Sequence, residues 1–189
     1  MNKDELRTLF KSKRSALDAS HIMKYEDLLL INFQQLEIDI PDRIMSYAVF
    51  EKMNEFDPLL ITDYCYFKNP ALELLYPVID AKTNSMKSML VNDETLFVPN
   101  KFGIPEPIDC PTVVCEEIDM VIVPLLAYDV KGHRVGYGKG YYDRFLKHCK
   151  DDVVKIGFSF FEPVDIIRDS TRQDVKLDYC ISPERIYRF

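Results

Sequence analysis

Glycine is rare in this chain except in one stretch, residues 129–146, which reads D-V-K-G-H-R-V-G-Y-G-K-G-Y-Y-D-R-F-L. Four of the chain's six glycines lie in this stretch: Gly132, Gly136, Gly138 and Gly140. Glycine is favoured where a side chain would obstruct the backbone or the approach of a ligand. A loop of this kind can present its N–H groups to a phosphate. Arg134 and Lys139 add positive charge in the same stretch, which favours a phosphorylated ligand.

The segments on either side of the loop also suit a phosphate. An apolar run at residues 120–127 precedes the loop, and a helical pattern at residues 141–146 follows it. The order strand, glycine-rich loop, helix brings loop N–H groups and a helix start to one point, where anions bind well. Asp143 lies within the first turns of that helix. A carboxylate beside cations and a phosphate loop indicates a nucleotide bound together with Mg²⁺.

The loop differs from two common nucleotide motifs. No Ser or Thr follows Lys139, as G-x-x-x-x-G-K-[ST] requires, and the spacing is not G-x-G-x-x-G. A second interpretation is therefore open, in which the stretch is a tight turn whose lysine and arginine are solvated. The glycines at alternate positions and the adjacent Tyr141 and Tyr142 favour a ligand surface over a bare connection.

The composition is that of a soluble, acidic protein. Hydrophobic residues make up 47% of the 189 residues and charged residues 29%, and the formal net charge is −7. This length predicts one domain, residues 1–189. The negative charge argues against a nucleic-acid partner, and no apolar run is long enough to span a membrane. We expect a monomer whose partner is a small molecule.

The cysteines and the N-terminal residues bear on the compartment. Five cysteines are scattered along the chain without a C-x-x-C pair, so neither a disulfide framework nor a zinc site is indicated. The sequence M-N-K-D-E-L-R lacks the apolar segment of a signal peptide. The reducing cytoplasm is the expected location.

Two helices are expected in the N-terminal part of the chain. Residues 3–17 keep the spacing of three and four between apolar residues that marks one helix face. Lys3 and Arg7 lie one turn apart on the same side, which as an isolated pair is typical of a solvated face. The second helix is expected to begin after Ser20, as its N-cap, and to end near Leu36.

The rest of the chain alternates strands with helices. Strands are expected at residues 43–50, 72–79, 86–91, 95–98, 118–127, 153–160 and 175–182. Helices are expected at residues 58–67 and 140–150, with a helical turn at 162–168 and irregular chain at 100–111. We expect strands 86–91 and 95–98 to pair antiparallel through the Asn92-Asp93 turn. The nearly continuous apolar run at 118–127 indicates a central parallel strand, so the class is α/β with a mainly parallel sheet.

Carboxylates outside the glycine loop are further candidates for the same site. Glu55 lies in the loop after the first strand, and open α/β sheets place ligand contacts at the carboxyl ends of strands. The alternative is a solvated loop carboxylate. Asp174 and Asp178 lie near the start of the last strand. A carboxylate there could join Asp143 at Mg²⁺, which takes one or two protein carboxylates plus phosphate oxygens.

The sequence V-P-L-L-A-Y-D, followed by G-H-R-V-G-Y-G-K-G-Y-Y-D-R-F, closely resembles the signature of the 5-formyltetrahydrofolate cyclo-ligase family. The resemblance is dense over residues 123–146 and sparse over most of the remaining chain. It implies a three-layer α/β fold with helices on both faces of the sheet, similar to sugar-phosphate isomerases and CoA transferases. It also implies cyclisation of 5-formyltetrahydrofolate to 5,10-methenyltetrahydrofolate, dependent on ATP and Mg²⁺, with release of ADP and phosphate.

The resemblance also implies roles for single residues. K-D-E-L-R resembles the family's first ATP-binding segment and places Lys3 and Arg7 at the nucleotide. N-E-F-D-P resembles a folate-binding segment, which makes Glu55, and with it Phe50, substrate contacts. F-G-I-P-E-P at residues 102–107 resembles a further family segment. D-V-K-L-D resembles the segment whose second aspartate, here Asp178, binds magnesium together with Asp143.

The main ATP-binding segment of the family corresponds to the glycine loop. The residues expected to contact the nucleotide there are Arg134, Gly136, Tyr137, Gly138, Lys139, Gly140, Tyr141 and Tyr142. Arg134, Lys139 and Tyr142 are the expected catalytic groups. Tyr137 and Tyr141 are also expected to contact the folate.

Two other functions stay open on the residues alone. An ATP-dependent kinase or ligase that acts on another small molecule would use the same glycine loop. A nucleotide-binding regulatory protein without catalysis would retain the loop too, although Asp143 and Asp178 favour an enzyme. Formation of methenyl-folate from 5-formyltetrahydrofolate, ATP and Mg²⁺ separates the three.

Overall fold

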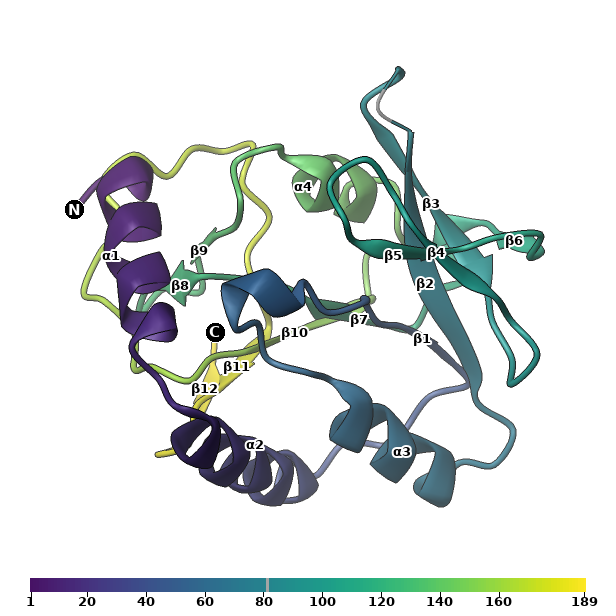
Figure 1. Ribbon diagram of the computed structural model, residues 1–189, viewed down its shortest axis with the longest axis horizontal. Coiled ribbons are helices and arrows are strands. Elements are labelled where there is room, and N and C mark those ends of the chain that lie inside the picture. Colours follow the sequence, from purple (N-terminus) through teal and green to yellow (C-terminus); the bar gives the residue numbers. More distant parts are fainter. Residues whose placement is uncertain (81) are drawn as a thin grey trace.

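The computed structural model describes residues 1–80 and 82–189. Its centre is an eight-stranded sheet with the order β12-β11-β10-β7-β1-β2-β3-β6 (Figure 1). The strands paired in parallel are β1 (Arg43–Met45), β2 (Glu73–Asp80), β7 (Met120–Val123), β10 (Val154–Phe158) and β11 (Tyr179–Ile181). Antiparallel strands close the edges: β3 (Ser85–Leu90) and β6 (Thr112–Val113) on one side and β12 (Ile186–Arg188) on the other. The predicted α/β class with a mainly parallel sheet is confirmed.

The central strand, β7, shows why helices must cover both faces of the sheet. All of its residues are buried, and successive side chains of a strand point to opposite faces. Met120 and Ile122 pack in a cluster with residues of α2 (Ala19–Gln34) and α3 (Leu59–Lys68). Val121 and Val123 pack in a second cluster with residues of α4 (Tyr141–Leu146). The three-layer arrangement is therefore confirmed.

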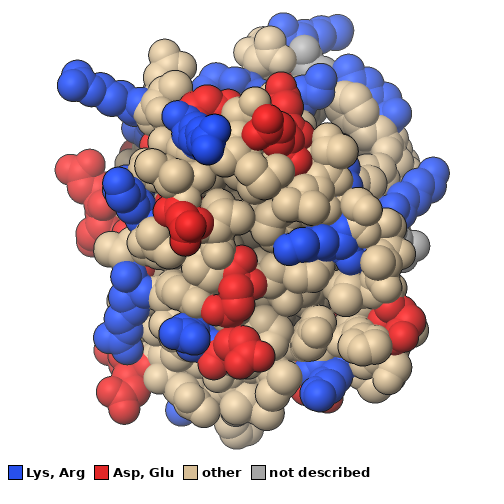
Figure 2. Space-filling view, turned by 90° about the vertical axis from the view of Figure 1, so that its left-hand side faces the viewer, with Lys and Arg blue, Asp and Glu red and all other residues tan. Residues whose placement is uncertain are grey.

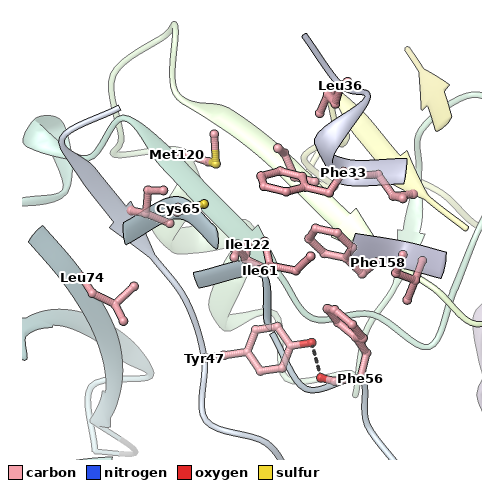
Figure 3. Close-up of a cluster of buried hydrophobic side chains, with 14 of the residues drawn as sticks. Phe33, Leu36, Tyr47, Phe56, Ile61, Cys65, Leu74, Met120, Ile122 and Phe158 are labelled. Carbon is pink, nitrogen blue, oxygen red and sulfur yellow. Dashed lines mark hydrogen bonds between the residues drawn. The ribbon is translucent and has the colours of Figure 1, made fainter. Parts of the chain in front are cut away.

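The layer on the α2 and α3 side is rich in aromatic rings. Figure 3 shows Phe33 of α2 and Ile61 of α3 above the sheet residues Ile122 and Phe158. Phe158 stacks on Phe56, with ring centroids 4.8 Å apart. Leu29 and Phe33, the buried residues of α2, thus face this layer of the core.

α1 (Lys3–Ser15) lies beside the sheet and packs on a small hairpin (Figure 1). That hairpin consists of β8 (Ala127–Tyr128) and β9 (Arg134–Val135), paired antiparallel. Leu6 and Phe10 of α1 are buried in a third apolar cluster with residues of the hairpin. The helix begins with a capping box between Asn2 and Glu5, which fixes its start next to residues 168–174.

The strand pairing predicted near residue 92 is wrong. β3 pairs with β2 and β6, whereas β4 (Phe97–Pro99) pairs with β5 (Pro105–Pro107), inside the segment expected to be irregular. The Asn92–Thr95 turn therefore joins strands of two different sheets. The choice of partner depends on segments far apart in the sequence, which a local turn signal does not reveal.

Several predicted boundaries are also corrected. The first strand ends at Met45 instead of continuing to residue 50, and the chain then turns into a short 3-10 helix, Glu51–Met53. Asp18, not Ser20, caps α2, because its side chain accepts the His21 N–H at 2.9 Å. A second 3-10 helix, Cys115–Glu117, precedes β7. The segment expected as a helical turn at 162–168 is extended chain in which Val164 bridges to Asp129.

Charge is mixed on the face that carries α1. Figure 2 shows acidic and basic side chains interspersed there rather than gathered into one field. Within the described part of the chain, no helix is both long and apolar enough to cross a membrane.

Candidate functional site

One cavity of about 430 Å³ lies between α1, α4 and the β4–β5 hairpin. Its volume is within the roughly 300–1,000 Å³ of typical small-ligand pockets. Its walls include residues that directly follow the carboxyl ends of β1 and β7, such as Tyr47 and Pro124. This is the place where parallel α/β sheets bind ligands.

Almost every site residue expected from the sequence lines this cavity. They are Lys3, Arg7, Phe50, Glu55, Arg134, Gly136, Tyr137, Gly138, Lys139, Gly140, Tyr141, Tyr142 and Asp143. They come from three separate segments of the chain, and the fold brings them together. Asp178 is the exception among the expected residues.

In the glycine loop, two carbonyl groups accept hydrogen bonds from side chains of the protein, whereas the N–H groups have no acceptor among the described residues. Arg7 Nε donates to the carbonyl oxygen of Gly136 at 2.9 Å, and Arg144 donates to that of Lys139 at 3.0 Å. The N–H groups of residues 136–140 donate no hydrogen bond to any described residue. Gly138 and Gly140 have φ values of 91° and 66°, which residues with side chains rarely adopt. The loop therefore offers a row of free donors to a ligand.

The N-terminal half of α1 supplies two cations to the same cavity. Lys3 Nζ lies 2.7 Å from both carboxylate oxygens of Asp174, and Arg7 holds the glycine loop as described above. Their side chains are only 18% and 23% exposed, so the pair is not a solvated helix face. The Lys139 ammonium has no carboxylate partner among the described residues.

Glu55 is a buried residue of the cavity wall. One carboxylate oxygen accepts the Phe50 N–H at 3.0 Å, and the other accepts the Tyr137 hydroxyl at 2.8 Å. Burial raises the pKa of Glu55, while these two hydrogen bonds act in the opposite direction. Glu55 is thus not a solvated loop carboxylate. Ile104 and Glu106, from the F-G-I-P-E-P segment, also line the cavity.

Sequence reasoning did not identify Arg14, a buried residue that contacts Tyr137 of the cavity. It is 3% exposed and donates to the Tyr137 hydroxyl at 3.1 Å. In the sequence it is one of three basic residues near the end of the first helix, with Lys11 and Lys13. The available signal was its spacing of seven from Arg7, which puts both residues on one helix face.

Arg134 and Tyr142 both line the cavity, but they differ in hydrogen bonding. The buried Arg134 guanidinium donates to Asp143 at 2.9 Å and also to the carbonyl oxygen of Val175. The Tyr142 hydroxyl is buried and has no hydrogen-bond partner among the described residues. Because an unpaired buried hydroxyl is costly, it marks a place where a ligand atom would be bound.

The structure separates Asp178 from Asp143. The Asp178 carboxylate accepts the Lys155 N–H at 2.8 Å and is 2.8 Å from the Lys155 ammonium, outside the cavity. Asp174 lines the cavity together with Asp143 instead. No cluster of three or more potential ligands (His, Cys, Asp or Glu) occurs within residues 1–80 and 82–189. Asp143 and Asp174 are two carboxylates, which is the number that Mg²⁺ commonly takes when phosphate oxygens complete its shell.

Comparisons with known proteins show which family this chain resembles. A family model described as the 5-formyltetrahydrofolate cyclo-ligase family matches residues 1–180. A 5-formyltetrahydrofolate cyclo-ligase from Mycoplasma pneumoniae is 26% identical, with 97% of this chain and 100% of the relative covered. A probable 5-formyltetrahydrofolate cyclo-ligase from Schizosaccharomyces pombe is 27% identical, with 100% and 98% covered. The solved structure of a 5,10-methenyltetrahydrofolate synthetase from Aquifex aeolicus superposes with a TM-score of 0.81 at 28% identity, covering 100% of this chain and 93% of that one.

Proposed function

The chain belongs to the 5-formyltetrahydrofolate cyclo-ligase family, and we propose that it cyclises 5-formyltetrahydrofolate to 5,10-methenyltetrahydrofolate while ATP is converted to ADP and phosphate. The free N–H groups of residues 136–140 carry this proposal, because they can donate to phosphate oxygens in a cavity that is also lined by apolar side chains such as Ile79, Met86 and Ile104. We propose that residues 1–189 form a single catalytic domain that acts as a monomer.

In this proposal the nucleotide lies along the glycine loop and the start of α1. The loop N–H groups hold the phosphates, and Lys3, Arg7 and Lys139 neutralise their charge. Arg134 lies deeper in the cavity and faces the transferred phosphoryl group. Positioning and charge neutralisation of this kind are the main contributions of proteins to phosphoryl transfer.

We propose Mg²⁺ as the companion of ATP, held by Asp143 and Asp174. Both carboxylates line the cavity, and both are bound to cations of the protein, Arg134 and Lys3 respectively. The metal would neutralise phosphate charge that these side chains cannot cover alone. Asp178 has no part in this proposal, because its carboxylate is engaged by Lys155 outside the cavity.

The folate would bind beside Glu55 in the cavity. A pterin ring has several N–H donors, and the Glu55 carboxylate retains lone pairs beyond those used by Phe50 and Tyr137. The side chains of Phe50, Tyr137 and Tyr141 are placed to contact the flat ring. Tyr142 would donate its unpaired hydroxyl proton to the substrate or to a phosphate oxygen.

The proposed chemistry requires no nucleophile from the protein. The formyl oxygen takes the terminal phosphoryl group of ATP, and ADP leaves. The second folate nitrogen then attacks the formyl carbon, the bond from that carbon to the phosphorylated oxygen breaks, phosphate leaves and the nitrogen loses its proton. The role of the cavity is to hold the two reactants in line and to exclude water, which would hydrolyse the activated formyl group.

A direct assay tests this function. The purified protein with 5-formyltetrahydrofolate, ATP and MgCl₂ should produce the methenyl-folate absorbance band, with equimolar ADP. Asp143→Asn should abolish turnover, because the Mg²⁺ site loses a charge, while the circular dichroism spectrum stays that of the wild type. ADP formation with a different acceptor would select another kinase or ligase, and ATP binding without turnover would select a regulatory protein.

A further inference from the structure

Arg14 is a third cation on the face of α1 that carries Arg7. At 3.6 residues per turn, seven residues bring Arg14 to within about 20° of Arg7. Its carbon chain and guanidinium are buried, whereas its neighbours Lys11 and Lys13 are exposed. Arg14 does not line the cavity, so it acts on a ligand only through other residues.

The contacts of Arg14 join four segments of the chain. Its guanidinium donates to the Tyr137 hydroxyl at 3.1 Å and to the carbonyl oxygen of Leu125. Its own carbonyl oxygen accepts from Asn54 at 3.0 Å, and Asn54 directly precedes Glu55. Asn54 has a φ of 43°, a conformation that this contact helps to hold. Arg14 thus ties the glycine loop and the Glu55 loop to the same helix.

The hydrogen bonds around the Tyr137 hydroxyl have a fixed direction. A guanidinium can only donate, so Arg14 uses an acceptor position of this oxygen. The single hydroxyl proton then goes to the other neighbour, Glu55, at 2.8 Å. Glu55 must accept it, which suits a carboxylate.

We propose that Arg14 is a positioning residue for the substrate half of the site, which orients the Tyr137 hydroxyl through its guanidinium and maintains Glu55 as a carboxylate through its charge. The inference rests on the proposed function, in which Glu55 and Tyr137 contact the folate. It predicts that α1 serves both halves of the cavity: Lys3 and Arg7 serve the nucleotide, and Arg14 serves the folate.

The groups that face Glu55 give this role an electrostatic basis. Burial raises the pKa of Glu55, and the positive charge of Arg14 lowers it, together with the hydrogen bonds from Phe50 and Tyr137. Three tyrosine hydroxyls also interact with Glu55, from Tyr47, Tyr137 and Tyr142, and burial raises the pKa of each, so they remain neutral. Without the charge of Arg14, the pKa of Glu55 would rise further.

The test separates the positive charge of residue 14 from the hydrogen-bonding geometry of its guanidinium. Arg14→Met removes both the charge and the paired donors, Arg14→Lys keeps the charge, and Lys11→Met is the matched control on the exposed side of the same helix. Initial rates of methenyl-folate formation are measured against 5-formyltetrahydrofolate with ATP saturating, against ATP with 5-formyltetrahydrofolate saturating, and as a function of pH. Calorimetric titration with 5-formyltetrahydrofolate gives the binding constant independently of turnover.

For Arg14→Met we expect the KM for 5-formyltetrahydrofolate to rise about tenfold, the effect of one charge-assisted hydrogen bond, while the KM for ATP changes less. The acid limb of kcat/KM should move to higher pH, so that raising the pH restores part of the loss. Arg14→Lys should return the acid limb to its wild-type position with only partial recovery of KM. Lys11→Met should behave as the wild type.

Three results would overturn the inference. The first is a wild-type KM and pH profile in Arg14→Met. The second is a loss that is equal at every pH and equal for both substrates, as for a structural defect. If Arg14→Met does not fold, Tyr137→Phe provides the test, since it interrupts the same connection without emptying the Arg14 site; an unchanged KM for 5-formyltetrahydrofolate there is the third. A wild-type protein without turnover would instead refute the proposed function.

Discussion

Replacing Gly138 by alanine tests how the glycine loop is held. Gly138 has a φ of 91°, and a Cβ there would lie 3.1 Å from Cζ of Arg7. The left-handed backbone costs a residue with a side chain about 1–2 kcal/mol. The contact in addition displaces the Arg7 guanidinium, which donates to the carbonyl oxygen of Gly136 at 2.9 Å. We expect both a loss of stability and a defect in nucleotide binding.

Substitutions at two other glycines separate the loss of stability from the defect in nucleotide binding. Gly103 has a φ of 82° and no atom within 4 Å of its Cβ position, so Gly103→Ala carries the backbone strain alone. Gly136→Ala meets nothing within 4 Å in the protein and lacks a left-handed φ, so it should keep its stability. Urea unfolding gives the free energy of unfolding for each variant, and steady-state kinetics gives the KM for ATP.

Gly103→Ala and Gly138→Ala should each lose about 1–2 kcal/mol of unfolding free energy. Only Gly138→Ala should also raise the KM for ATP, about tenfold, since the loop loses a hydrogen bond to a charged group. If the KM for ATP in Gly138→Ala equals that in Gly103→Ala, the idea that Arg7 holds the loop for the nucleotide is refuted.

Three further substitutions test other parts of the site. Asp174→Asn should lower kcat/KM by about tenfold or more and weaken Mg²⁺ activation, whereas Asp178→Asn should retain wild-type kinetics; the reverse pattern would restore Asp178 to the metal site. Tyr142→Phe should lower kcat but raise the free energy of unfolding by about 1 kcal/mol, since a buried unpaired hydroxyl is removed; equal or lower stability in urea would contradict this. Burial raises the pKa of Glu55 in the folded state, so its contribution to stability falls as pH rises from the unfolded pKa to the folded one. Glu55→Gln should therefore gain stability relative to the wild type above that window and lose this gain below it, which melting temperatures at acid and neutral pH will show.

Local signals in the sequence predicted the segments that line the cavity, whereas the binding and catalytic roles of their residues stay predictions. Glycines at alternate positions between an apolar run and a helical pattern predicted the loop, and the structure has β7, this loop and α4 in that order. Local spacing also predicted α1, which begins at Lys3 as expected.

The parts that failed depend on distant partners. Which of Asp174 and Asp178 reaches the cavity is decided by the pairing of β11 with β10, which places Lys155 against Asp178. Likewise, the partner of β4 lies across a loop, and a turn signal at Asn92 could not reveal it. Arg14 was missed because burial, not residue type, distinguishes it from the basic residues beside it.

The charges of the cavity suggest how an empty site remains stable and still accepts a highly charged ligand. Lys3 is paired with Asp174, and Arg134 with Asp143, so two of the cations that would meet a phosphate already have a carboxylate partner. In the proposed function, a nucleotide and its metal offer all four side chains a new partner of the opposite charge: phosphate for the cations and Mg²⁺ for the carboxylates. Binding would then exchange ion pairs instead of burying charges without partners, which avoids the large desolvation penalty of an unpaired charge. The same argument explains why removing one carboxylate should be harmful even before the ligand arrives, because it leaves a buried cation unpaired.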